Sequence, residues 1–85
     1  MATISLEIGE TFEHYHATES FTQHVVGSLE LSYNDESYVL LDSETIKVPA
    51  QTSHTVKNVG MMVAVFKCYN HESDPDPGPT INPNP

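Results

Sequence analysis

Three histidines in two distant places are the residues of this chain best suited to chemistry: His14 and His16 near the start and His54 near the end. Residues two apart on a β-strand project from the same face, so His14 and His16 can act together if this segment is a strand. An imidazole from a distant strand would complete a three-nitrogen site for a divalent transition metal. The expected ion is Fe, Ni, Zn, Cu or Mn, and the histidines alone do not identify it. The alternative is that these histidines form a polar opening of the barrel and bind no metal.

Four other residues carry groups that could take part in chemistry. Glu19 is a candidate fourth metal ligand, against the simpler interpretation of a solvated loop acid. We expect His24 to be a strand histidine that faces the interior or an interface, and His71 to be solvated. Cys68 lies in an alternating apolar run, which favours a small strand residue over a nucleophile.

Short strands are the elements that must position these groups. β-branched and aromatic residues alternate with polar ones, and no helical periodicity persists. Gly27 predicts a tight hairpin between two of the strands. The pattern indicates an all-β fold, an antiparallel sandwich or small barrel of about eight strands. The predicted strands cover residues 4–8, 11–16, 20–26, 28–33, 38–41, 45–48, 54–59 and 61–69.

The length of 85 residues allows a single domain, which we place at residues 1–70, followed by a tail over residues 71–85. Five of the six prolines lie in residues 74–85, so this acidic, Pro-rich segment is predicted to be flexible. A core this small gains from a metal or a second subunit. We expect a homodimer, in which a partner subunit covers the edge of the first strand.

The net charge of −9 sets limits on partners. Twelve acidic residues stand against three lysines, and the chain has no arginine. Nucleic acid and anionic membranes are therefore excluded as expected partners, and strongly anionic small molecules are disfavoured. A single cysteine permits no intrachain disulfide, and neither a signal peptide nor an apolar membrane span is visible. These features favour a cytoplasmic protein.

Two motifs in the expected order carry a resemblance to a known family. Each joins metal-binding histidines to residues that shape the adjacent turns. The first comprises Gly9, His14, His16 and Gly27, and the second comprises Pro49, His54 and Asn58. In this respect the sequence resembles a small single-domain cupin. The resemblance implies a compact double-stranded β-helix, or jelly-roll, barrel of short antiparallel strands.

The chain departs from the cupin pattern at three positions. Ser20 occupies the slot of the family's glutamate ligand, and Glu19 stands one residue early. The four-ligand site of the family would thus become a three-histidine site. Ser43 and Gln51 replace two glycines, which affects turn geometry, and Asn58 is expected to bind the backbone.

The resemblance implies two classes of function. One is a small metal-dependent enzyme, a dioxygenase or a related activity, acting on a small neutral or metal-chelating molecule. The other is a non-catalytic module that binds a small molecule or a metal. Both predict a small-molecule ligand, and neither identifies the metal.

Overall fold

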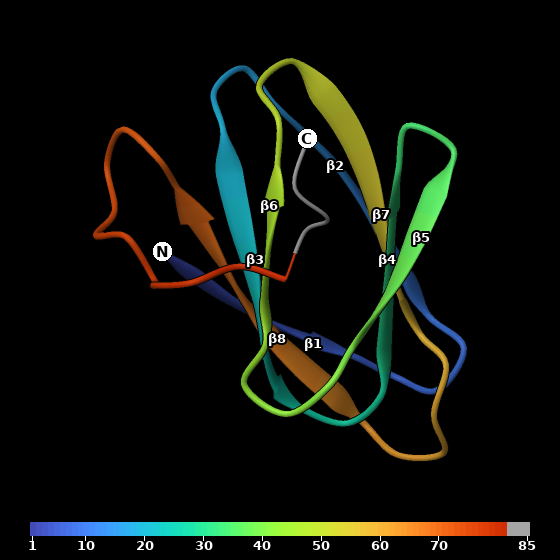
Figure 1. Ribbon diagram of the computed structural model, residues 1–85. Coiled ribbons are helices and arrows are strands. Elements are labelled where there is room, and N and C mark those ends of the chain that lie inside the picture. The colour runs from blue at the N-terminus through green and yellow to red at the C-terminus, as the bar shows by residue number, and fades with distance from the viewer. Residues whose placement is uncertain (82–85) are drawn as a thin grey trace.

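The computed structural model describes residues 1–81 and consists of two four-stranded sheets that face each other (Figure 1). Every pair of neighbouring strands is antiparallel. Among the described residues, no helix is long and apolar enough to cross a membrane. The strands are β1 (Ala2–Leu6), β2 (Thr11–His16), β3 (Ser20–Val26), β4 (Leu29–Tyr33), β5 (Glu36–Leu40), β6 (Thr45–Val48), β7 (Thr52–Asn58) and β8 (Ala64–Asn70).

The order of the strands confirms the predicted jelly-roll architecture. One sheet runs β1-β8-β3-β6 and the other β2-β7-β4-β5, so strands that follow each other in sequence often belong to different sheets. Apolar side chains at alternate positions turn inward and form the core between the sheets, because burying them removes apolar surface from water. The buried core comprises Leu6, Leu29, Leu31, Leu40, Ile46, Val48, Val56, Ala64 and Phe66.

The predicted hairpin at Gly27 is wrong. β3 pairs with β6 and β8, whereas β4 pairs with β5 and β7, so the turn at Gly27 carries the chain from one sheet to the other. Gly27 has φ +87°, and a Cβ there would lie 2.7 Å from the Cα of Ala64. The glycine is required for a tight crossing between sheets, which local sequence does not distinguish from a hairpin turn.

Several strand boundaries also differ from the prediction, and β5 and β7 each begin two residues earlier than expected. β1 ends at Leu6, and Ile8 is exposed in the turn that follows. β8 begins at Ala64 because residues 59–63 form a loop. β1 nevertheless lies at a sheet edge, as predicted, with β8 as its one strand partner among the described residues.

Asn58 fastens the loops at the end of the sandwich away from the histidines. Its side-chain nitrogen donates to the carbonyls of Leu6 (3.0 Å) and Met62 (2.8 Å), and its oxygen accepts from the N–H of Gly60 (2.9 Å). The side chain is 1% exposed. The expected structural role of Asn58 is confirmed by these three bonds.

Beyond β8, several residues of the chain contact the barrel, beginning with the N–H of His71, which donates to the carbonyl of Glu19 (3.0 Å). The carboxylate of Asp74 accepts from the N–H of Asn70 (2.8 Å) and from the amine of Met1 (2.5 Å), and these bonds lower the pKa of Asp74. The N–H of Ile81 donates to the carbonyl of Thr45 on β6 (2.9 Å). The flexibility expected of residues 71–85 stays a prediction, and residues 82–85 lie outside the described part of the chain.

Candidate metal centre

Strands β2 and β7 bring the three predicted histidines together. They pair antiparallel with His14 directly opposite His54, and His16 follows His14 by two residues. Directly opposed residues project from the same face of a sheet, as do residues two apart. All three imidazoles therefore lie on the inner face of the β2–β7 pair. The ring centroids of His54 and His16 are 5.6 Å apart with nearly parallel planes, and those of His54 and His14 are 6.1 Å apart.

The three rings differ in exposure and in hydrogen bonding. His14 Nδ1 lies 2.8 Å from His16 Nε2, so these two rings share a hydrogen bond. His14 is exposed and His16 is half-buried. His54 is 1% exposed, and neither of its ring nitrogens has a hydrogen-bond partner among residues 1–81. Such unpaired buried nitrogens are rare in folded proteins, because each forfeits its bonds to water.

Burial keeps the inner imidazoles neutral at pH 7. Desolvation, followed by repulsion from His16 and then His14, lowers the pKa of His54 to about 4. Desolvation and then His14 also lower the pKa of His16. A neutral imidazole offers a lone pair to a metal, whereas a protonated one does not. The donor set and the two unpaired nitrogens of His54 thus fit a transition-metal ion.

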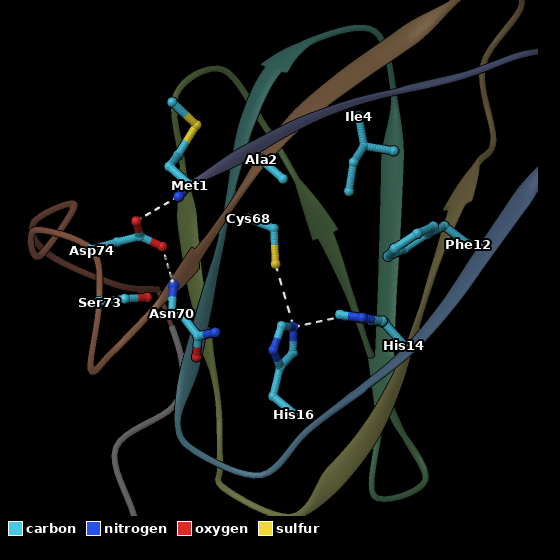
Figure 2. A pocket seen from close by; sticks show the side chains of 10 residues that line it. All are labelled: Met1, Ala2, Ile4, Phe12, His14, His16, Cys68, Asn70, Ser73 and Asp74. Atoms are coloured by element: carbon cyan, nitrogen blue, oxygen red, sulfur yellow. Dashed lines mark hydrogen bonds and ion pairs between the residues drawn. The ribbon is translucent and has the colours of Figure 1, made fainter.

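The opposite sheet contributes the sulfur of Cys68, which the sequence did not indicate as a metal ligand. Cys68 Sγ on β8 lies 3.4 Å from His16 Nε2, as Figure 2 shows. The ligand atoms of His14, His16 and Cys68 lie within 4.8 Å of one another, the arrangement of a group that could hold a metal ion. Burial, followed by the charge of Asp74, raises the pKa of the Cys68 thiol. His54 lies outside this tightest group.

The alternation of apolar residues along β8 could have indicated that the Cys68 side chain faces the interior. Ala64, Phe66 and Cys68 are buried in turn, so the cysteine shares the inward face with core residues. Alternation along one strand does not show which strand of the other sheet packs against its inward face. Only the packing of the two sheets places Cys68 opposite the histidines.

A cavity of about 350 Å³ lies beside this group, between the edges formed by β1 and β2. Ile4 and Phe12 form an apolar side, and the rings of His14 and His16 face the cavity (Figure 2). The carboxylate of Asp74 stands at the same opening. The full lining is Met1, Ala2, Ile4, Phe12, His14, His16, Cys68, Asn70, Ser73 and Asp74.

The other predicted residues are engaged elsewhere. The carboxylate of Glu19 lies 3.7 Å from Lys47 Nζ and 3.6 Å from Nδ1 of the exposed His71. His24 is buried, donates through Nε2 to the carbonyl of Gly27 (2.5 Å) and accepts at Nδ1 from the N–H of Ser43 (3.4 Å). These contacts give His24 a structural role and direct the Glu19 carboxylate toward Lys47 and His71.

The glutamate slot of the cupin pattern is held by a buried hydroxyl. Ser20 and Thr22 are fully buried on β3, and neither hydroxyl has a hydrogen-bond partner among the described residues. Thr22 stands directly opposite Cys68 in the β3–β8 pair, and Ser20 stands opposite Asn70. Together with Cys68 they make the wall facing the histidines polar.

Solved structures with the same fold are numerous but distant in sequence. A predicted oxalate decarboxylase from Thermotoga maritima matches at 18% identity with a TM-score of 0.69, over 78% of this chain and 59% of that one. A cupin superfamily protein from Desulfitobacterium hafniense matches at 17% identity with a TM-score of 0.68, over 80% and 62%. An RmlC-like cupin from Shewanella frigidimarina matches at 16% identity with a TM-score of 0.65, over 80% and 61%.

These likenesses show that the chain has the cupin fold, as its two histidine motifs predict. The chain spans less than two thirds of the length of each of these structures. No family model matches the sequence, and no curated protein matches it.

Proposed function

We propose that this cupin-fold chain binds a divalent transition metal through His14, His16 and His54, and that the adjoining cavity takes a small neutral or metal-chelating molecule. The carrying observation is His54, which is 1% exposed, has a lowered pKa and has two ring nitrogens without partners. A buried imidazole normally bonds a backbone carbonyl or a carboxylate, as His24 does here with Gly27. A metal ion would use one nitrogen of His54 and relieve part of that desolvation cost.

The cavity and its charge favour a neutral ligand. Its lining combines the apolar Ile4 and Phe12 with the carboxylate of Asp74. The chain has no arginine to clamp a carboxylate, and its net charge is −9. A dicarboxylate such as oxalate is therefore a poor fit to this cavity.

Two chemistries remain within this proposal. A metal-dependent dioxygenase would bind a chelating substrate at the metal, which when bound supplies Lewis acidity and a site for dioxygen. The histidines would hold the ion, and Ile4 and Phe12 would exclude water from the apolar side of the cavity. The second candidate is a non-catalytic binding module. It is favoured because two carboxylates are already engaged: Glu19 lies near Lys47 and His71, and Asp74, which lines the cavity, bonds the amine of Met1 and the N–H of Asn70.

Metal content measured by elemental mass spectrometry on the untagged protein tests the proposal. We expect near-stoichiometric metal in the parent and its loss in His54→Ala. His71→Gln is the matched control, because His71 is exposed and bonded to Glu19 outside the cavity. Glu19→Gln should also keep the metal. A parent without metal that takes up none of Fe, Ni, Zn, Cu or Mn on titration would refute metal binding.

Turnover is a separate question from metal binding. Oxygen consumption by the iron-loaded protein, measured against a panel of small chelating molecules, distinguishes the two chemistries. Turnover of one molecule, lost in His54→Ala, supports the enzyme. Thermal stabilisation by a molecule that is not consumed supports the binding module.

We also propose a homodimer. β1 and β2 are edge strands of the two sheets, and residues of both line the same cavity. The loop between β7 and β8 adds exposed apolar surface, with Met61 92% and Met62 59% exposed. Exposed strand edges and apolar patches are surfaces that a second subunit could cover. Light scattering coupled to size-exclusion chromatography tests this, and a monomeric mass at micromolar concentration would contradict it.

A further inference from the structure

We infer that Cys68 supplies a thiolate ligand to the same metal, so that the ion joins the two sheets and the site selects thiophilic metals such as zinc, cobalt or copper. This inference rests on the proposed metal site and adds a ligand that no histidine motif contains. The histidines come from β2 and β7, whereas Cys68 comes from β8 in the facing sheet.

The distances already suit shared coordination. In a tetrahedral zinc site, one sulfur and one nitrogen ligand lie roughly 3.5 Å apart, which follows from bond lengths of about 2.3 and 2.0 Å. Cys68 Sγ and His16 Nε2 are 3.4 Å apart. His14 Nδ1 lies 2.8 Å from the same nitrogen and would need to move outward by only a few tenths of an ångström.

His54 provides the independent observation that this place is built for a ligand. Its two buried nitrogens have no partner among residues 1–81, and its ring lies parallel to that of His16. Cys68 alone could be explained as a small core residue, because free cysteines are often buried. A core residue does not require an unpaired imidazole beside the group it contacts.

One neighbour of Cys68 is polar and could serve a sulfur that a metal ion holds as thiolate. Thr22 stands opposite it in the β3–β8 register with a buried hydroxyl that has no partner in the described chain. A hydroxyl at this position can turn to donate a hydrogen bond to a thiolate. Ser20, which occupies the position of the family's anionic glutamate, is neutral. Cys68 would restore one negative charge to the ligand set, from the neighbouring strand β8.

This ligand set has two chemical consequences. On binding, the Cys68 thiol gives its proton to solvent and forms the sulfur–metal bond, so one proton is released from the thiol for each ion bound. A soft sulfur ligand moves the preference away from Mn and toward Zn, Co or Cu. Three imidazoles and one thiolate fill a tetrahedral ion, which favours the binding module over the dioxygenase.

Titration with Co(II) tests the inference, because a cobalt–thiolate bond gives a charge-transfer band in the near ultraviolet. Cys68 is the single cysteine of the chain, so any such band belongs to it. We expect the band to saturate at one Co(II) per chain and to be absent in Cys68→Ser. We also expect Cys68→Ser to retain Co(II) through its histidines, with affinity lowered roughly tenfold or more.

Thiol alkylation provides a second measurement that needs no variant. Zinc should slow the reaction of Cys68 with a maleimide in the folded parent, and should not do so in His54→Ala. His71→Gln should behave as the parent in both measurements. The alkylation measurements do not use the Cys68→Ser variant, so they still test the inference if that variant fails to fold.

The outcomes distinguish the role of Cys68 as a ligand from the existence of the histidine metal site. Cobalt bound without the charge-transfer band, with no zinc protection of the thiol, would overturn the role of Cys68 and leave the histidine site standing. No binding of cobalt or zinc by the parent would overturn both. The band in the parent, lost in Cys68→Ser, supports a metal that joins the two sheets.

Discussion

The neutral, buried imidazole of His54 makes the stability of the metal-free protein depend on pH in a defined window. In the unfolded chain the histidine titrates near pH 6.5, whereas in the folded chain its pKa is about 4. Above pH 6.5 it is neutral in both states, so its contribution to stability is fully present. As the pH falls toward 4, His54 is protonated in the unfolded state but stays neutral in the folded state. The free energy of unfolding therefore decreases.

The size of this loss follows from the difference between the two pKa values. A change from 6.5 to about 4 corresponds to a loss of about 3 kcal/mol, approaching about 1.4 kcal/mol per pH unit within the window. The lowered pKa of His16 adds a loss of the same sign. The lowered pKa of Asp74 acts below its ordinary value of 3.8 and so falls outside the window.

Urea denaturation of the chelator-treated protein at a series of pH values from 7.5 to 4 measures the effect. His54→Leu is the informative variant, because it removes the titrating group and the two unpaired nitrogens while keeping an apolar side chain of similar size. We expect the variant to lose most of the pH dependence and to be at least as stable as the parent at pH 7. A parent whose stability is flat between pH 7 and 4.5, or a variant with an undiminished slope, would refute the reasoning.

Three further predictions concern the metal-free fold and are read from urea midpoints. Thr22→Val removes a fully buried hydroxyl without a partner among the described residues and should raise stability by about 1 kcal/mol, whereas a loss would point to a hydrogen bond we have not assigned. Ser43→Gly and Gln51→Gly should each raise stability by about 0.5–1 kcal/mol, because these residues have φ of 62° and 54°; unchanged or lower midpoints would contradict this. Gly27→Ala should cost about 2–4 kcal/mol, since the added Cβ would meet Ala64 at 2.7 Å, and a neutral result would refute the tight crossing.

Alternation and turn residues predicted nearly all of the fold. The eight strands lie close to their expected places, because inward and outward residues alternate along them and polar or glycine turns separate them. Local pattern did not show which strands pair. Gly27 illustrates this limit: a glycine with positive φ serves a hairpin and a crossing between sheets equally well, and only the register of β3 with β8 decides.

The same limit applies to the candidate site: local sequence indicated some of its residues, whereas the packing of the sheets was needed for others. His14 and His54 were connected by motif spacing, and the structure brings them directly opposite each other. Their role as ligands stays a prediction. Cys68 was missed because its partner, His16, is 52 positions away on another sheet. Such a contact depends on how two sheets face each other, which periodicity within one strand does not encode.

The positions of the unpaired polar groups argue against a site that is merely a polar end of the barrel. Among the described residues, the buried side-chain atoms without partners belong to Ser20, Thr22 and His54. All three project into the space between the sheets, around Cys68 and the β2–β7 histidines. Each such group costs about 1–3 kcal/mol when nothing bonds it, a large amount for a domain whose total stability is about 5–15 kcal/mol. A fold selected for stability alone would place Val and Leu at these positions. Their concentration around one cysteine and three imidazoles is what a ligand site requires, because a bound ion and its associated ligand can bond groups that the apo protein leaves unpaired.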